Sequence, residues 1–272
     1  MNDIIDIALS EDLRSGDITT DSLIPSGILG KGKLLVKEEG VLAGIEVASD
    51  VFHRVEPSLE FHELIHDGSK VKPGDIIATI SGPVSGILKA ERTALNFLQH
   101  MSGIATITAR YVEEASGFKA RILDTRKTIP GMRSLEKYAV RAGGGKNHRQ
   151  SLGDMVLIKD NHLAVLNSKG ISLGEAVEMV KRLARVEVEA KSLEQVNEAL
   201  EAGADIIMLD NMSIDDMRLA VELCRGKVKL EASGGITLEN VRAVAETGVD
   251  FISAGSLTHS ARALDISLEL EV

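Results

Sequence analysis

The sequence predicts an α/β protein whose second half forms a parallel sheet, because short apolar strands alternate there with helical segments. Strands that are separated by helices pair in parallel, and six successive units favour a barrel over an open sheet. The expected strands are residues 122–124, 155–158, 186–189, 206–209, 228–231 and 251–254.

An internal repeat supports this architecture. The segments VEVEAKSLEQVNEALEAGADIIML and VKLEASGGITLENVRAVAETGVDFISA share one skeleton, and we expect their helices to begin at Ser192 and Thr237. The second copy has three additional residues in the loop after its strand, where the chain reads Ser233-Gly234-Gly235. Glycines at the carboxyl end of a barrel strand let backbone N–H groups approach an anion, which predicts a phosphate site.

The first half has a different pattern. Apolar residues recur at three- and four-residue intervals from Lys89 to Ala115, which predicts a long helix that is bent or broken near Gly103. The other expected elements are helices at 2–10 and 45–55, strands at 33–37 and 59–65, and a turn-rich β passage at 66–84.

Composition excludes several classes. The chain has 272 residues, of which 44% are hydrophobic and 26% charged, as in soluble globular proteins with one large domain or one large and one smaller domain. Cys224 is the only cysteine, which fits a cytoplasmic protein without an intrachain disulfide. The acidic first residues do not resemble a signal peptide, and no apolar run approaches the roughly 18 residues of a membrane span.

A basic segment, residues 124–162, interrupts an acidic chain of net charge −10. It favours a pocket for a small anion over a nucleic-acid surface, which would form a broad basic stripe. Arg126 and Lys127 follow a strand end and, with Arg149 and Lys159, could hold a dianion or two carboxylates. The alternative is a set of solvated surface charges. The segment contains eight basic residues against four acidic ones, Arg126, Lys127, Arg133, Lys137, Arg141, Lys146, Arg149 and Lys159 against Asp124, Glu136, Asp154 and Asp160.

Two carboxylates, Glu189 and Asp210, end strands at corresponding positions, and Glu231 is a possible third. Such groups can bind sugar hydroxyls or Mg²⁺, or stabilise a developing cation, although a single acidic strand end is often structural. His148 and His162 stand in no zinc-binding spacing.

Taken together, these motifs resemble the quinolinate phosphoribosyltransferase family over nearly the full length. The most specific stretch is DTRKTIPGMRSLEKYAVRAGGGKNHR, followed by LIKDNH. Further matching segments are EDLRSGDITTDSLIP, ERTALNFLQHMSGIAT, VEVEA, MLDN, EASGGI and SAGSLTHSARALDISLEL.

The resemblance implies an α/β fold with an N-terminal α/β sandwich domain, residues 1–104 and 262–272, and an incomplete α/β barrel, residues 105–261. The last strand returns to the sandwich domain. The resemblance also implies a homodimer, or an oligomer built from dimers, in which the partner completes each active site. No nucleic acid or membrane is an expected partner.

The implied enzyme is a pentosyltransferase of NAD biosynthesis. It joins quinolinate to 5-phosphoribosyl-1-pyrophosphate with Mg²⁺ and yields nicotinate mononucleotide, pyrophosphate and CO₂. Two alternatives stay open: a related phosphoribosyltransferase with another acceptor, such as nicotinate or that of a molybdenum-associated paralogue, and a non-catalytic sensor of phosphorylated pyridines.

The resemblance also implies residue roles. Lys127, Lys159, Glu189 and Asp210 are the expected catalytic residues, and Glu189 and Asp210 could hold Mg²⁺ through water. Ser151 and Arg262 stand where the family pattern has glycine and proline. The expected contacts are Arg126, Lys127, His148, Arg149 and Lys159 around the quinolinate carboxylates, Arg92 from the partner, Glu189 and Asp210 near the ribose, and Ser233, Gly234, Gly235 and Gly255 at the 5′-phosphate.

Overall fold

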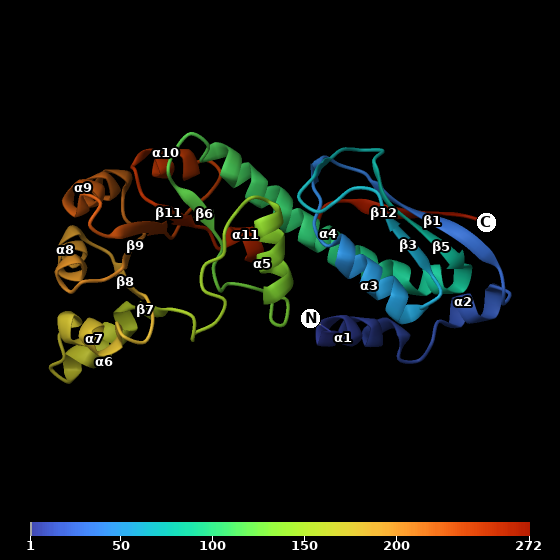
Figure 1. Ribbon diagram of the computed structural model, residues 1–272, viewed down its shortest axis with the longest axis horizontal. Helices are drawn as coiled ribbons and strands as arrows, with labels where there is room; N and C mark the ends of the chain where they lie inside the picture. Colours follow the sequence, from blue (N-terminus) through green and yellow to red (C-terminus); the bar gives the residue numbers. More distant parts are fainter. Residues whose placement is uncertain (1) are drawn as a thin grey trace. The chain divides into compact units, whose positions relative to one another are not determined.

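The computed structural model describes residues 2–272 and contains two compact units (Figure 1). Residues 128–144 belong to the first compact unit, whereas the predicted domain boundaries place them in the barrel domain. Those domain boundaries stay a prediction. No helix within residues 2–272 combines the length and the apolar character that a membrane span requires. The first unit comprises residues up to Ala109, Thr128–Gly144 and Ser260–Val272, and the second comprises Arg110–Lys127 and Gly145–His259.

The second unit is built on a six-stranded parallel sheet with the order β6-β11-β10-β9-β8-β7. No strand pairing within residues 2–272 joins β6 to β7, so the sheet is an incomplete barrel, and all six predicted strands are confirmed. The strands are β6 (Arg121–Leu123), β7 (Val156–Ile158), β8 (Val186–Ala190), β9 (Ile206–Asp210), β10 (Lys229–Ser233) and β11 (Phe251–Ser253).

Helices follow the strands of this sheet. Ser192 caps α8 by accepting a hydrogen bond from the Gln195 N–H, so the predicted start of that helix is confirmed. The predicted start at Thr237 is wrong, because the Asn240 side chain binds the backbone of Thr237 and Gly235 and delays the helix to Val241. The helices are α6 (Asp160–Ser168), α7 (Leu173–Val180), α8 (Leu193–Glu201), α9 (Ile214–Cys224), α10 (Val241–Glu246) and α11 (Ser256–His259).

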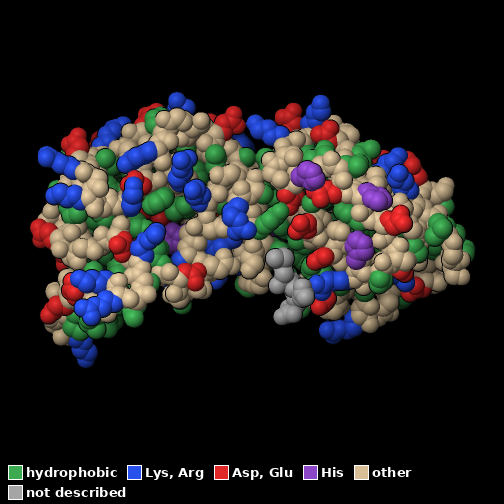
Figure 2. Space-filling model, viewed as in Figure 1, with side chains coloured by type: hydrophobic (Ala, Val, Ile, Leu, Met, Phe, Trp, Pro, Cys, Tyr) green, Lys and Arg blue, Asp and Glu red, His purple; other side chains and the backbone are tan. Residues whose placement is uncertain are grey.

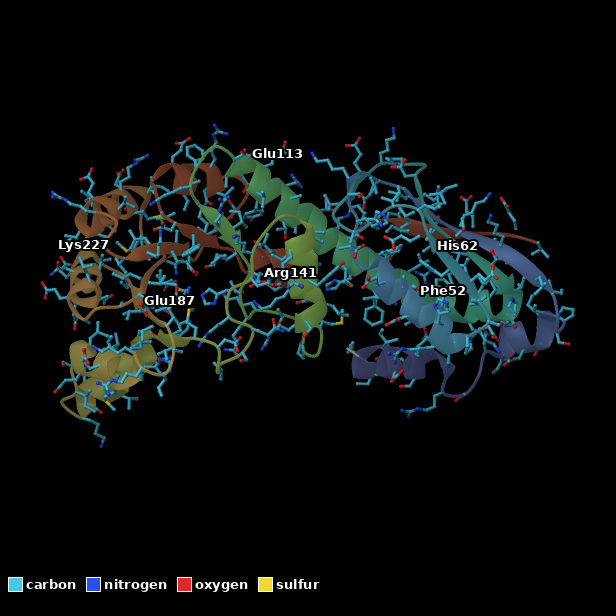
Figure 3. All side chains as sticks on the ribbon, viewed as in Figure 1. Phe52, His62, Glu113, Arg141, Glu187 and Lys227 are labelled. Atoms are coloured by element: carbon cyan, nitrogen blue, oxygen red, sulfur yellow. The ribbon has the colours of Figure 1, made fainter. Side chains whose placement is uncertain are left out.

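The first unit contains an antiparallel sheet with the order β12-β1-β5-β3. The C-terminal strand β12 pairs with β1, which confirms the predicted return of the chain. Phe52 of α3, which Figure 3 labels, is fully buried. Its ring centroid lies 5.9 Å from that of Phe61 of β3, and the two rings are tilted by 38°. The elements are β1 (Leu29–Val36), β2 (Gly40–Val41), β3 (Glu60–Glu63), β4 (Lys70–Val71), β5 (Ile76–Pro83) and β12 (Ile266–Glu271), with α1 (Asn2–Leu13), α2 (Ile18–Leu23), α3 (Ile45–Val55) and α5 (Arg133–Ala142).

One long helix, α4 (Val84–Glu114), has 31 residues without interruption, so the predicted break near Gly103 is wrong. A Cβ atom at Gly103 would lie 2.1 Å from the carbonyl oxygen of Arg262. The glycine therefore permits close backbone approach of the C-terminal segment.

Candidate active site

A cavity of about 660 Å³ opens at the carboxyl ends of the strands in the second unit. Lys and Arg side chains gather on the face of this unit shown in Figure 2, near a partly covered histidine. Of the predicted substrate contacts, all but one line this cavity: Arg126, Lys127, His148, Arg149, Lys159, Glu189, Asp210, Ser233, Gly234, Gly235 and Gly255.

The exception is Arg92. It lies on α4 in the first unit and is exposed to solvent. Arg92 does not line the cavity of the second unit, so its predicted contact with the substrate of a partner subunit stays a prediction.

The sheet supplies an acidic floor to the cavity. Glu187 and Glu189 lie on the same face of β8 because side chains alternate along a strand. Glu189 stands opposite Met208 of β9, which stands opposite Glu231 of β10. Sequence reasoning missed Glu187, although its place two residues before Glu189 was the available signal.

The basic wall contains two neighbouring guanidinium groups. Burial and then the charge of Arg126 lower the pKa of Arg149. One Arg149 guanidinium nitrogen donates to the Met155 carbonyl at 3.0 Å. Because two like charges repel in a partly buried site, an anion bound beside both groups would be stabilised strongly.

The two lysines of the cavity are held differently. The Thr258 hydroxyl donates to the Lys127 carbonyl at 2.7 Å, which fixes the backbone of Lys127 from α11. The Lys159 ammonium lies 3.3 Å from the Glu189 carboxylate, and Lys159 is exposed. The Glu189 side chain is only 9% exposed, so Lys159 compensates a largely buried negative charge at this side of the cavity.

The second predicted carboxylate, Asp210, lies 4.0 Å from the Lys191 ammonium. Lys191 lies closer to Asp160, at 2.7 Å, and this hydrogen bond is the main reason that the pKa of Lys191 is raised. Sequence reasoning gave Lys191 no role. Its position near Asp210 limits the negative charge at that side of the cavity.

Two loops form the predicted phosphate side. Gly234 and Gly235 have φ values of +87° and +62°, a conformation that favours glycine. A Cβ at Gly234 would lie 2.4 Å from the Asn211 side chain. Tyr111, which sequence reasoning missed, donates to the Ile236 carbonyl at 3.4 Å and lies 3.1 Å from the Ser256 hydroxyl, so it ties the two loops together.

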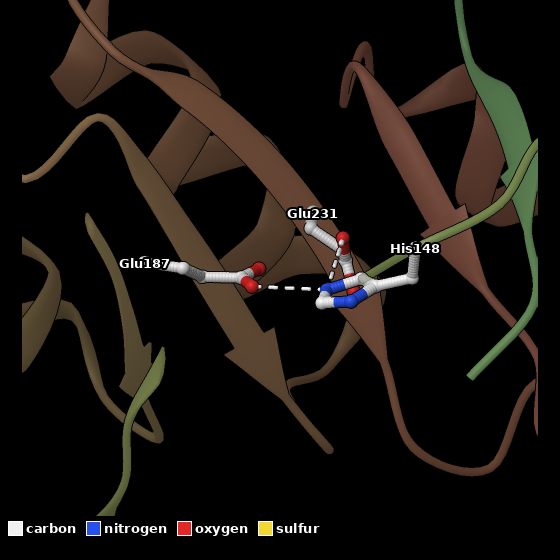
Figure 4. A group of neighbouring side chains, drawn as sticks. All are labelled: His148, Glu187 and Glu231. Atoms are coloured by element: carbon white, nitrogen blue, oxygen red, sulfur yellow. Dashed lines mark hydrogen bonds and ion pairs between the residues drawn. The ribbon is translucent and has the colours of Figure 1, made fainter. Parts of the chain in front are cut away.

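His148, Glu187 and Glu231 form a cluster of neighbouring side chains in the second unit (Figure 4). The His148 Nε2 atom is 3.0 Å from Glu187 and 3.6 Å from Glu231. Both carboxylates have 0% exposure, and neither carboxyl oxygen of Glu231 has a hydrogen-bond partner among the described residues. Burial, and then the charge of Glu187, raise the pKa of Glu231 to about 8. Burial and the neighbouring charge of Glu187 therefore favour the protonated form of Glu231.

Glu231→Gln is expected to stabilise the fold, increasingly so as the pH rises. Between the ordinary carboxyl pKa of 4.5 and about 8 the folded chain holds a proton that the unfolded chain releases, so wild-type stability falls across this window. Denaturant unfolding at pH 5 and pH 8 measures the difference, with Glu222→Gln on the exposed surface of α9 as the control. A stability gain that is equal at both pH values would contradict the buried neutral acid.

Comparison with known proteins identifies the family. The family model "Quinolinate phosphoribosyl transferase, N-terminal domain" matches residues 17–102, and its C-terminal counterpart matches residues 104–269. The nicotinate-nucleotide pyrophosphorylase [carboxylating] of Mycobacterium leprae is 45% identical over 98% of this chain and 96% of its own. A probable enzyme of the same name from Bacillus subtilis is 42% identical over 96% of this chain and 90% of its own.

Solved structures agree with the sequence comparison. The crystal structure of NadC from Streptococcus pyogenes superposes with a TM-score of 0.93 at 41% identity, covering 99% of this chain and 96% of that one. Human nicotinic acid phosphoribosyltransferase reaches a TM-score of 0.60 at 14% identity, over 90% of this chain and 70% of that one, a likeness of fold alone. The chain therefore belongs to the quinolinate phosphoribosyltransferase family.

Proposed function

We propose that this chain is the enzyme that transfers phosphoribosyl from 5-phosphoribosyl-1-pyrophosphate to quinolinate. The acceptor loses CO₂, and the products are nicotinate mononucleotide, pyrophosphate and CO₂. The observation that carries the proposal is that one cavity, in a member of this family, combines a pair of guanidinium groups, two acidic strand ends and two glycine loops. These suit a dicarboxylate, a ribose and a phosphate respectively.

The guanidinium pair is the proposed site for the quinolinate carboxylates. Arg126 and Arg149 are close enough for one to lower the pKa of the other, and a doubly charged pyridine would neutralise both. A guanidinium can bind a carboxylate through two parallel hydrogen bonds, which also fixes the plane of the ring. Orienting the ring aligns its nitrogen with the ribose carbon that it attacks.

The acidic strand ends serve the ribose. As pyrophosphate leaves, the sugar acquires oxocarbenium character, and Glu189 and Asp210 stabilise that positive charge. Decarboxylation then leaves an electron pair on the ring carbon, which takes up a proton from solvent to complete the product, and the cations Lys127 and Lys159 favour the transient negative charge. These four residues are the proposed catalytic set.

Mg²⁺ is the proposed cofactor. Glu189 and Asp210 provide the hard oxygen atoms that Mg²⁺ prefers, and both line the cavity. They would hold the ion through its water molecules, and the ion would neutralise the pyrophosphate and make it a better leaving group.

The proposed dimer with shared active sites rests on the resemblance to the family and on the position of Arg92. An exposed arginine on a helix of the first unit is available to a second copy of the chain, and we place it in the partner's site. A cytoplasmic homodimer, or an oligomer built from such dimers, is the corresponding assembly.

A product assay tests the function. Quinolinate with 5-phosphoribosyl-1-pyrophosphate and Mg²⁺ should give a mononucleotide and CO₂ in equal amounts. Turnover of nicotinate in place of quinolinate would favour the paralogous transferase, and binding of nicotinate mononucleotide without any turnover would favour the sensor.

Gly235→Ala is expected to raise the KM for 5-phosphoribosyl-1-pyrophosphate about tenfold and to change the KM for quinolinate much less. At Gly235 the added Cβ meets nothing closer than the Asn211 side chain at 3.8 Å, so it projects into the space where the phosphate approaches. Gly234→Ala is less informative, because it also displaces Asn211. Steady-state kinetics with each substrate varied in turn measures both constants.

The control for this variant is Gly203→Ala. Gly203 has a similar positive φ of +80° and open space around it, but it does not line the cavity. It reproduces the backbone strain of an alanine in this conformation without a phosphate nearby. Equal effects of Gly235→Ala on both substrates would argue against a phosphate cradle.

A further inference from the structure

Both ring nitrogens of His148 are engaged by the protein. The backbone N–H of Arg149 donates to Nδ1 at 2.8 Å, and Nε2 lies 3.0 Å from Glu187. A ring nitrogen can accept an N–H only if it carries a lone pair, so the proton of the ring is on Nε2. His148 is thus a neutral imidazole that donates its one N–H to Glu187.

This tautomer decides whether His148, Glu187 and Glu231 form a metal site or a hydrogen-bond network. Nε2 of His148 and one carboxylate oxygen each of Glu187 and Glu231 lie within 4.8 Å of one another, close enough to ligate a metal ion. A metal ligand would need the lone pair of Nε2, and a ligating histidine normally donates its other ring N–H. Because Nδ1 accepts a hydrogen bond here, the cluster is a hydrogen-bond network rather than a metal site.

The same network fixes the loop that carries Arg149. Asp124, which follows β6 and is fully buried, accepts the backbone N–H of His148 at 2.9 Å and the side-chain amide of Asn147. Glu187 of β8 holds the ring of His148. Two buried carboxylates, one just after β6 and one on β8, therefore anchor residues 147–149, and the ring of His148 orients the peptide N–H of Arg149.

We propose that His148 is a positioning residue that acts through Arg149 and does not itself contact the substrate. Its ring has no N–H left for a ligand, whereas the loop that it holds presents the Arg149 guanidinium to the cavity. Holding that group in place before binding removes an entropic cost from substrate capture. The inference rests on the proposed function, which gives Arg149 a carboxylate of quinolinate.

A double-mutant cycle tests the proposal. His148→Ala and Arg149→Ala should each raise the KM for quinolinate by about tenfold or more, with a smaller change for 5-phosphoribosyl-1-pyrophosphate. The double variant should be no worse than Arg149→Ala, because a positioning residue has no effect once its target is gone. Losses that multiply in the double variant would overturn the proposal, since His148 would then contribute a contact of its own.

A matched pair at Glu187 provides a conservative rescue. Glu187→Gln keeps an oxygen that accepts the Nε2–H of His148, whereas Glu187→Leu does not. The leucine variant should raise the KM for quinolinate as His148→Ala does, and the glutamine variant should recover most of that loss. Equal losses in both variants would show that the charge of Glu187, rather than its acceptor oxygen, matters, and would overturn the positioning role.

Nitrogen-15 NMR of histidine-labelled wild-type enzyme reads the tautomer directly. The resonance pair of His148 is the one missing from His148→Ala, and it should show an unprotonated Nδ1 and a protonated Nε2 at pH 7, with and without quinolinate. A protonated Nδ1 would overturn the proposal. An unchanged KM in Arg149→Ala would instead refute the substrate contact in the proposed function, while the NMR result would stand.

Discussion

Arg126→Ala is expected to lower kcat/KM for quinolinate about tenfold to a hundredfold while the protein stays folded. The variant removes a charge-assisted carboxylate contact worth about 1.5–3 kcal/mol from a cavity wall rather than from the core. It also removes the positive charge that lowers the pKa of Arg149, so thermal stability should be unchanged or slightly higher. Steady-state kinetics and a thermal unfolding curve on the same sample measure the two effects.

The control is Arg218→Ala, which changes an exposed arginine of α9 that does not line the cavity. It should leave both kinetic constants within error, because an exposed ion pair such as Arg218–Asp215 contributes little. An Arg126→Ala enzyme with wild-type kcat/KM for quinolinate would remove Arg126 from the proposed site.

Mixing two variants of strongly reduced activity, Arg92→Ala and Arg126→Ala, is expected to raise the activity above that of either variant alone. If the partner supplies Arg92, each heterodimer has one site with both lesions and one site with neither. Random exchange between equal amounts should then give about a quarter of the wild-type activity, because about half of the dimers are mixed and each has one intact site. The measurement is activity against time after mixing, with subunit exchange followed by a fluorescence label on one variant.

The matched control mixes Arg126→Ala with Arg149→Ala. Both lesions lie in the same cavity of one chain, so every site in a mixed dimer carries one of them and no recovery is expected. Proven subunit exchange without recovery in the first mixture would place Arg92 in its own subunit's site or outside any site.

The sequence by itself determined the architecture of the second unit. Apolar strands and helical spacing are local patterns, and all six predicted strands of the sheet formed where the alternation placed them. Strand-end residues such as Arg126, Glu189 and Asp210 were predictable for the same reason, since the carboxyl ends of parallel strands meet on one side of a barrel. Nearly all the predicted contacts accordingly share one cavity.

Only the tertiary structure decided the features that arise where segments distant in sequence come into contact. Gly103 looked like a helix break, but its role is set by a carbonyl of Arg262, which no local pattern reveals. The tautomer of His148 depends on Glu187, 39 residues away, and on the backbone of Arg149. Burial likewise raised the pKa of Glu231, because the low polarity of a packed interior is a property of the assembled fold and not of the residue.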